Sequence, residues 1–247
     1  MEENTTIFGI RAVLEAIQSN ESIDKIYIQK GLSGPLFIEL QKAVSKENFN
    51  LSYVPVEKLN KLAKGNHQGV VAKISPVKFG EMEKVLEEVL KNEKKTPLFL
   101  LLDQVTDARN FGAMIRTAEC CGVDAIIIPA KGAAPVNADT VKTSAGAVFK
   151  IPICKVNHIK DAVYYMQSSG IKVVAATEKT DDSIYDLDLA EPVALIMGNE
   201  EKGVSHGVLK IVDSKAKLPL LGTIGSLNVS VACGAFLYEI VRQRLKN

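Results

Sequence analysis

The sequence predicts an α/β fold in two parts, a small α/β domain followed by a larger domain built on a parallel sheet. Three observations predict this. Short strands alternate with amphipathic helices over residues 1–76. A strongly charged segment, residues 77–97, interrupts this pattern. From Leu98 onward the strands are continuous Val, Ile and Leu runs, which are typical of parallel sheets buried on both faces.

Residues 1–76 are predicted to form a layered α/β domain of their own. Apolar residues at Ile10, Val13 and Ile17 recur at helical spacing and give the first helix one buried face. The expected helices are Gly9–Gln18, Pro35–Val44 and Val56–Ala63, and the expected strands are Lys25–Gln29, Leu51–Val54 and Gln68–Ile74. This part of the sequence holds no acidic pair, Ser/His arrangement or set of metal ligands, so no catalysis is predicted for it.

The charged segment between the two domains is predicted to be a connecting helix. Glu81 to Lys95 carries five Glu and four Lys, while apolar residues recur at helical spacing. Pro97 ends the helix, because proline disfavours helical backbone at the residue before it. We therefore expect a first domain over 1–76, a solvated linker helix over 77–97 and a second domain over 98–247.

The second domain is predicted to be a parallel sheet with helices between its strands. The expected strands are Leu98–Leu102, Ala125–Ile128, Ile151–Cys154, Ile171–Ala175 and Val193–Met197. Ligands of such sheets bind outside the carboxyl ends of the strands. The loops that follow Leu102, Ala176, Met197 and Leu218 are therefore the candidates for a site.

Composition excludes several classes of protein. Apolar residues make up 47% and charged residues 24% of the chain, as in ordinary soluble globular proteins. The polar, acidic N-terminus is no signal peptide, and the apolar runs are too short to cross a bilayer. Four cysteines without a C-x-x-C pair and three scattered histidines predict no disulfide framework and no metal site. These features together favour a cytoplasmic protein.

Charge by itself does not identify the partner. The net charge is +1, and residues 1–76 hold nine Lys/Arg against eight Asp/Glu. Nucleic-acid-binding proteins usually show a strong basic excess, so this balance argues mildly against such a partner. A small local patch remains open, because phosphate contacts need only a few cations.

The loop after Leu102 leads into a helix with one arginine apart from its apolar stripe. Asn110 is the expected N-cap of this helix. At about 100° per residue, the buried stripe comprises Phe111, Ile115 and Ala118. Arg116 lies on another face, shared with Gly112, Ala113 and Cys120. Two interpretations stay open: a cation with room for a ligand, or a surface arginine paired with Glu119.

Two more segments combine glycines with polar side chains. In the first, the strand Val193–Met197 runs into Gly198-Asn199-Glu200-Glu201-Lys202-Gly203, which lacks the G-K-[ST] of a phosphate-binding loop. In the second, Lys217-Leu218-Pro219-Leu220 leads through Gly222 and Gly225 to a helix expected to carry Ser226, Asn228 and Ser230 in its first turn. Small residues follow from Ala232 to Ala235, and they predict unusually tight packing.

Taken in this order, the three segments resemble the three motifs of the SpoU/TrmH family, the RNA 2′-O-ribose methyltransferases of the SPOUT class. The matching stretches are Asn110–Ala118, Gly198–Gly203, and Leu218–Leu220 with Ser226–Ser230, and Ser144–Ala147 also fits. Residues 7–76, with Gly9–Val13 and His67–Val70, are similar to the family's N-terminal RNA-binding domain, which resembles a small ribosomal protein. That extension is characteristic of members that act on a guanosine of 23S rRNA.

The resemblance implies a deep trefoil knot near the C-terminus, an S-adenosylmethionine cofactor, an RNA substrate and a homodimer, without metal or membrane. A knot would need slender side chains where backbones cross. The implied cofactor-binding residues are Met197, Gly198, Asn199, Gly203, Leu218, Leu220, Leu227 and Asn228.

The resemblance also implies the catalytic residues Arg116, Asn110, Glu200, Ser226 and Asn228. Because a guanidinium stays protonated in proteins, Arg116 is expected to clamp the target phosphate, with proton abstraction left open. Glu200 is the expected partner that holds Arg116, and the other three would orient ribose and cofactor. Three other functions stay open: a tRNA 2′-O-methyltransferase, a non-catalytic RNA-binding protein, and a nucleotide-dependent oxidoreductase. The last is disfavoured because no strand precedes a G-x-G-x-x-G.

Overall fold

A computed structural model describes residues 6–46, 49–92 and 94–245 of the chain. The chain divides into two compact units, Met1–Lys78 with Pro135–Asn137, and Phe79–Ala134 with Ala138–Asn247. The predicted boundary after residue 76 lies close to this division.

The smaller unit contains a four-stranded mixed sheet in the order β1-β4-β2-β3. Its strands are β1 (Thr6–Phe8), β2 (Ile23–Gln29), β3 (Leu51–Val54) and β4 (Val70–Ile74), and its helices are α1 (Ile10–Gln18), α2 (Pro35–Lys46) and α3 (Val56–Leu62). Strand β4 pairs antiparallel with β1 and β2, whereas β2 and β3 are parallel. Helices α1 and α2 share one core with the sheet, and α3 forms a separate small core with Val54 and Val71.

The larger unit contains a six-stranded sheet in the order β10-β8-β9-β5-β6-β7, in which every pairing is parallel. Its strands are β5 (Leu98–Leu102), β6 (Ala125–Pro129), β7 (Ile153–Val156), β8 (Lys172–Ala176), β9 (Val193–Met197) and β10 (Ser214–Ala216). Its helices are α4 (Met82–Leu90), α5 (Ala108–Cys120), α6 (Ala138–Thr143), α7 (Ile159–Ser168), α8 (His206–Leu209) and α9 (Val229–Arg244), with 3-10 turns η1 (Ala147–Phe149) and η2 (Ile184–Asp186). The α/β fold class with a parallel C-terminal sheet is therefore confirmed.

Two short strands were not predicted from the sequence, and one predicted strand begins later than expected. Strands β1 and β10 have three residues each, which is too few to show a period of two. Strand β7 begins at Ile153, two residues later than expected, because Pro152 cannot donate a ladder hydrogen bond.

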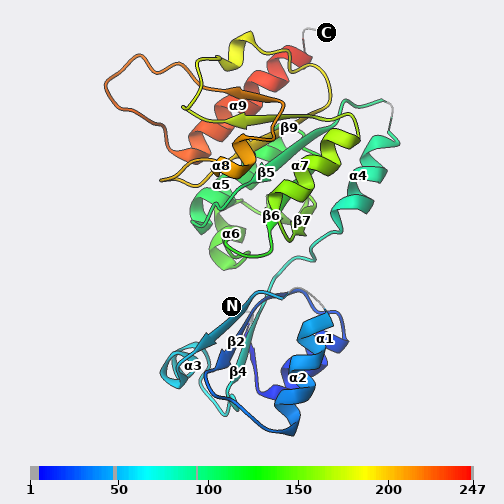
Figure 1. Cartoon of the computed structure of the whole chain (residues 1–247), viewed down its shortest axis with the longest axis vertical. Coiled ribbons are helices and arrows are strands. Elements are labelled where there is room, and N and C mark those ends of the chain that lie inside the picture. The colour runs from blue at the N-terminus through cyan, green and yellow to red at the C-terminus, as the bar shows by residue number, and fades with distance from the viewer. Residues whose placement is uncertain (1–5, 47–48, 93, 246–247) are drawn as a thin grey trace. The chain divides into compact units, whose positions relative to one another are not determined.

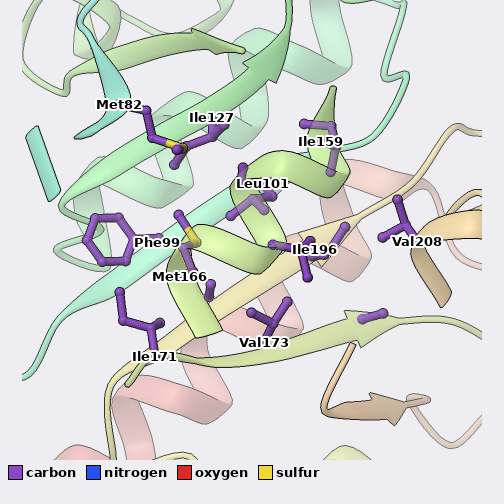
Figure 2. Packing of buried hydrophobic residues seen from close by; sticks show 14 of the residues in the cluster. Met82, Phe99, Leu101, Ile127, Ile159, Met166, Ile171, Val173, Ile196 and Val208 are labelled. Carbon is purple, nitrogen blue, oxygen red and sulfur yellow. The ribbon is translucent and has the colours of Figure 1, made fainter. Parts of the chain in front are cut away.

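One face of the larger sheet is covered by α4, α7 and α8. Figure 2 shows Phe99, Leu101 and Ile196 of the strands packing with Met166 of α7 and Val208, which lies in α8. Met82 and Leu86 of α4 belong to the same core and are buried. The expectation of a solvated connecting helix is therefore wrong, because the apolar stripe of α4 packs on the larger unit.

Helix α9 (red in Figure 1) lies on the opposite face of the sheet from α7. Its end is held by polar contacts with the loop between β8 and β9. The Gln243 side chain accepts a hydrogen bond from the Leu189 amide (2.8 Å) and donates one to the Leu187 carbonyl (3.0 Å). The Arg244 guanidinium donates to the carbonyls of Pro97 (2.9 Å) and Glu191 (2.8 Å). These contacts fix the last turn of α9 against the start of β5 and the loop between β8 and β9.

Candidate active site

A cavity of about 350 Å³ opens at the carboxyl ends of β8 and β9. It is lined by Ala176, Thr177, Glu178, Met197, Gly198, Asn199, Glu200, Glu201, Gly203, Lys217, Leu218, Leu220, Gly225, Ser226, Leu227, Val229, Ala232 and Phe236. Every predicted cofactor-binding residue lines this cavity except Asn228. Glu200 and Ser226 also line it, whereas Asn110, Arg116 and Asn228 do not.

One wall of the cavity is the glycine turn, residues 198–203, in which the backbone folds back closely on itself. A Cβ atom on Gly198 would lie 2.1 Å from both the carbonyl carbon of Gly203 and the nitrogen of Val204. Asn199 and Gly203 exchange two backbone hydrogen bonds (3.1 and 2.9 Å), and Gly203 has a φ of +69°. Glycine is therefore required at both ends of the turn, once for space and once for its backbone conformation.

The Asn199 side chain fixes the interior of this turn. Its Oδ1 accepts hydrogen bonds from the amides of Glu201 (3.0 Å) and Lys202 (3.1 Å). Its Nδ2 donates to the carbonyl of Gln104 (3.0 Å), in the loop after β5. An asparagine that bonds amides two and three residues ahead stabilises a turn in the manner of an Asx-turn.

The loop after β5 holds the same turn and the residues around it through hydrogen bonds. The Asp103 amide donates to the carbonyl of Met197 (2.8 Å), and its buried carboxylate accepts from the amide of Ser205 (2.8 Å). Gln104 has a φ of +62°, which is uncommon for a residue with a side chain. Sequence reasoning missed Asp103, although an acidic residue directly after a buried strand was a visible signal.

Three polar side chains from distant segments meet beside the cavity. Asn228 Nδ2 donates to Asn110 Oδ1 (3.1 Å), and Asn110 Nδ2 donates to Glu200 Oε1 (3.4 Å). These bonds connect the starts of α9 and α5 with the glycine turn. In sequence, Asn110 lies 90 residues from Glu200 and 118 from Asn228, and these bonds bring the three motif segments together beside the cavity.

The structure corrects the expected starting points of both helices. The N-cap of α5 is Asp107, whose carboxylate accepts from the amides of Arg109 (2.9 Å) and Asn110 (2.8 Å). Asn110 lies inside the first turn, so its side chain is free to reach Glu200. Helix α9 begins at Val229 with Asn228 as its N-cap, so Ser226 belongs to the preceding loop.

The expected pairing of Arg116 with Glu200 is not formed. Arg116 is exposed, and within the described ranges it makes no hydrogen bond or ion pair, with Glu119 or with Glu200. Arg116 follows Asn110 by six residues, which places it about 240° further around the helix. The two side chains of α5 therefore point in different directions.

Two groups of small residues have other roles than expected. A Cβ atom on Gly112 would lie 1.8 Å from Thr143 Oγ1, so this glycine lets α6 approach α5 and does not make room for a ligand. At Gly234 the same atom would lie 3.6 Å from Thr117 Cγ2, an ordinary van der Waals contact. The unusually tight packing expected over Ala232–Ala235 is therefore not found at Gly234.

The second wall is the exposed loop, residues 217–228 (orange in Figure 1). Leu218, Leu220 and Leu227 turn apolar surface toward the cavity, whereas Leu221 is fully exposed. Sequence reasoning missed Glu178 and Phe236, which lie outside the three motif segments, and it assigned no role to Glu201 and Lys217 within those segments.

The cavity fits a small amphipathic ligand. Its volume lies in the range of small-molecule sites, and it combines apolar side chains with three carboxylates and one lysine. Among the described residues, no group of three or more His, Cys, Asp or Glu side chains could hold a metal ion. In the same part of the chain, no helix is long and apolar enough to span a membrane.

Burial makes Cys121, Cys154 and Cys233 poor nucleophiles. Burial raises the pKa of Cys121 and of Cys154 to about 11, so both are thiols at neutral pH. Burial also raises the pKa of Cys233, which is buried in α9. Since the thiolate is the nucleophile, these three side chains are packing residues and not candidate catalysts.

Comparison with known proteins agrees with this geometry. The SpoU rRNA Methylase family matches residues 97–238, and the RNA 2′-O ribose methyltransferase substrate-binding family matches residues 6–80. The chain is 35% identical to the 23S rRNA (guanosine-2′-O-)-methyltransferase RlmB of Pseudomonas aeruginosa, over 99% of this chain and 98% of that protein. It is 32% identical to the putative TrmH family tRNA/rRNA methyltransferase YacO of Bacillus subtilis, over 98% and 97%.

A solved structure shares the fold over nearly the whole chain. The SpoU methyltransferase AviRb of Streptomyces viridochromogenes, in complex with AdoMet, superimposes with a TM-score of 0.62 at 25% identity, covering 98% of this chain and 91% of that one. The match of the family model over more than half of the sequence and the near-complete overlap with curated relatives lead to one conclusion. The chain belongs to the SpoU rRNA methylase family.

Proposed function

We propose that the protein transfers the methyl group of S-adenosylmethionine to the ribose 2′-OH of a guanosine in 23S rRNA, in the cytoplasm. The observation that carries the proposal is the cavity at the ends of β8 and β9, walled by two of the three motif segments and bonded to the third through Glu200 and Asn110. The near-complete overlap with RlmB supports 23S rRNA as the substrate. A tRNA substrate is the second candidate, because YacO is named for tRNA as well as rRNA.

The lining of the cavity suits the parts of this cofactor. Leu218, Leu220 and Leu227 offer an apolar surface for an aromatic base, and Gly198 lines the cavity beside them. Glu178, Glu201 and Lys217 carry charges that match an ammonium and a carboxylate group. When bound, the cofactor supplies a methyl carbon activated by its positively charged sulfur.

The Asn228–Asn110–Glu200 chain would orient the ribose. A sugar hydroxyl is a poor nucleophile, so its position relative to the methyl carbon contributes strongly to the rate. The Nδ2 group of Asn110 and that of Asn228 each carry two N–H donors and use one of them, so the second could bond a ligand hydroxyl. Ser226, exposed at the edge of the cavity, adds a further hydroxyl.

Arg116 would supply the charge that favours the attacking oxygen. Its guanidinium can clamp the target phosphate in two hydrogen bonds and stabilise negative charge that develops on the 2′-oxygen. Proton abstraction by an arginine activated by that phosphate stays the alternative. Because Arg116 is turned away from Asn110, it reaches solvent and not the cavity of its own chain.

We infer that the protein acts as a homodimer in which Arg116 completes the site of the other copy. Exposed apolar side chains lie on the exposed loop and on the outer face of α9, namely Leu221, Ile224, Val231 and Tyr238. An apolar patch of this kind on a folded protein is typical of an interface. A second copy of the chain would cover it and would bring an arginine to each site.

Calorimetric titration with S-adenosylmethionine, followed by mapping of 2′-O-methyl groups in 23S rRNA and in tRNA from a deletion strain, tests the proposal. We expect binding to the intact protein and the loss of one methyl group from 23S rRNA. A folded protein that gives no heat would instead be a non-catalytic RNA-binding protein. Loss of a methyl group from tRNA alone would identify the second candidate.

Mixed dimers test the role of Arg116. We expect Arg116→Ala to retain cofactor affinity and to lose roughly 10²-fold or more in kcat, as is usual when a preorganised charge is removed. Arg116→Lys should restore little, because lysine lacks the planar fork. Mixing Arg116→Ala with a cofactor-binding variant should restore part of the activity, because one of the two sites then holds both functions. Near-normal turnover by Arg116→Ala alone would contradict the mechanism.

A further inference from the structure

The smaller sheet has one face that only a short helix covers. Side chains alternate between the two faces of a strand, so the register of the strands assigns each residue to a face. Val71 and Tyr27 pack with α3, and Lys73 and Lys25 lie two residues from them in β4 and β2. Lys73 is paired with Lys25, and with Thr6 on the other side. We call this side of the sheet, together with α3 and residues 63–65, the α3 face.

Two neighbouring rows of side chains cross the α3 face. The first row holds Phe8, Val71 and Tyr27, and α3 packs on its centre, where Val71 is buried. The second row holds Thr6, Lys73 and Lys25. The small core that α3 forms with the sheet includes no residue of this second row, and both lysines are partly exposed.

Two lysines of this face lie near one aromatic ring. The Nζ atoms of Lys25 and Lys58 lie 5.3 and 5.7 Å from the centre of the Tyr27 ring. Burial, and then the charge of Asp24, raise the pKa of Tyr27, so its hydroxyl stays neutral beside the lysines. Lys73 donates a hydrogen bond to the Thr6 hydroxyl. The ammonium groups of Lys25, Lys58 and Lys73 are thus held by contacts on this face.

The charge of the domain is distributed unevenly between its two sides. The α3 face carries five lysines against two carboxylates, namely Lys25, Lys58, Lys61, Lys64 and Lys73 against Asp24 and Glu57. Helices α1 and α2 carry both signs in similar numbers. A domain that is almost neutral as a whole therefore presents one basic face.

We propose that the α3 face binds the phosphate backbone of the RNA substrate, with Lys25 and Lys73 as its central contacts. The inference rests on the proposed function, since it takes RNA as the partner. Lysine is a compact point charge, so these contacts would hold and position the RNA without reading its sequence. The clustered cations suit a polyanion better than an apolar protein surface, because the open row between Thr6 and Lys25 exposes no large apolar side chain.

Salt-dependent binding of the full chain to a 23S rRNA transcript and to an unrelated RNA of equal length tests this site. For Lys25→Gln/Lys73→Gln we expect weaker binding to both RNAs and a salt slope that falls by about 2, one for each lost phosphate contact. The control variant Lys42→Gln/Lys91→Gln makes the same change in net charge outside the α3 face, at exposed positions. We expect it to keep the wild-type slope.

A charge-retaining variant separates lost charge from lost packing. Lys25→Arg/Lys73→Arg should keep the slope and the affinity, even if contacts with Tyr27 and Thr6 change. An unchanged slope in the glutamine variant, or an equal loss in the Lys42 and Lys91 control, would overturn the proposal. If a protein ligand and not RNA were lost from the glutamine variant, the face would be a protein-docking surface and the proposal would be wrong.

The same measurements distinguish this inference from the proposed reaction. A wild-type protein that binds RNA through these lysines but transfers no methyl group would refute the proposed function and leave the α3 face intact. A wild-type protein that methylates 23S rRNA, while the glutamine variant binds with an unchanged slope, would refute only the α3 face.

Discussion

The two walls of the cavity are built in opposite ways. The glycine turn is folded back on itself and bonded to the loop after β5 through Asp103, Gln104 and Asn199. The exposed loop, in contrast, forms no hydrogen bond between Pro219 and Leu227 with any other described residue. Its apolar side chains at Leu221 and Ile224 are 100% and 78% exposed.

This difference indicates where the site gets its precision and where it depends on a partner. The turn is determined by contacts within the single chain, so it can present its backbone to a ligand before the ligand arrives. The exposed loop lacks such contacts and leaves apolar surface in water, which costs about 25 cal/mol for each Å². A ligand in the cavity and a second copy of the chain are the natural sources of the missing contacts.

Gly198→Ala should have the largest effect, because it adds a methyl group where two backbone segments of the turn come closest to each other. A methyl group 2.1 Å from the backbone of Gly203 and Val204 cannot be accommodated without moving the turn. We expect the free energy of unfolding to fall by about 3 kcal/mol and cofactor binding to be lost. Denaturant melts and calorimetry measure both quantities.

Gly222→Ala is the matched control for this change. Gly222 lies in the exposed loop with no atom within 4 Å of the added methyl group. Its stability should stay within about 0.5 kcal/mol of wild type. Equal effects of the two substitutions would break the contrast between the walls.

Leu221→Ser/Ile224→Ser tests whether a second copy covers the exposed loop. Both side chains are largely in water in the single chain, so the melting of a monomer should hardly change. If they become buried on dimerisation, the dimer should be weaker by about 3 kcal/mol. Sedimentation over a range of protein concentrations measures this shift, and an unchanged dimer would place the interface elsewhere.

Asp103→Ala tests the anchor of the glycine turn. It leaves the Ser205 amide without the buried carboxylate that accepts its hydrogen bond. An unsatisfied buried donor costs about 2 kcal/mol, and the loosened turn should also bind the cofactor less tightly. Asp103→Asn retains an acceptor oxygen and should recover most of the loss. Wild-type affinity in the alanine variant would show that the turn does not depend on this anchor.

Gln104→Gly should have the smallest effect, and of the opposite sign. The left-handed backbone at Gln104 is strained for a residue with a side chain, and glycine relieves that strain while the carbonyl still accepts from Asn199. Part of the gain is offset by the greater freedom of glycine in the unfolded chain, so we expect about 0.5 kcal/mol of added stability. Gln104→Ala keeps the strain and should show no gain in the same melts.

Much of the fold was predictable from local pattern. Continuous apolar runs identified β5, β6, β8 and β9, because a strand buried on both faces has no polar alternation. Strands β1 and β10 were too short to be recognised. The burial of α4 was also missed, since its charged face dominates the composition of the segment.

The sequence predicted most residues of the site but not the contacts between them. Seven of the eight expected cofactor-binding residues line the cavity, and Asn228 lies beside it as a helix cap. The sequence did not predict that Glu200 bonds Asn110 and not Arg116. Which side of α5 each residue faces depends on where the helix begins, and the structure places its N-cap at Asp107.

The sequence by itself determined the class of fold, the three segments that carry the chemistry and the glycine at each end of the turn. Periodicity and residue type are local properties, and they survive in the unfolded chain. Only the tertiary structure decided which groups meet. Asn110 bonds Glu200 across 90 residues of sequence and Asn228 across 118, and those meetings depend on the order β10-β8-β9-β5-β6-β7. Strand order follows from packing between distant elements, which no local pattern encodes.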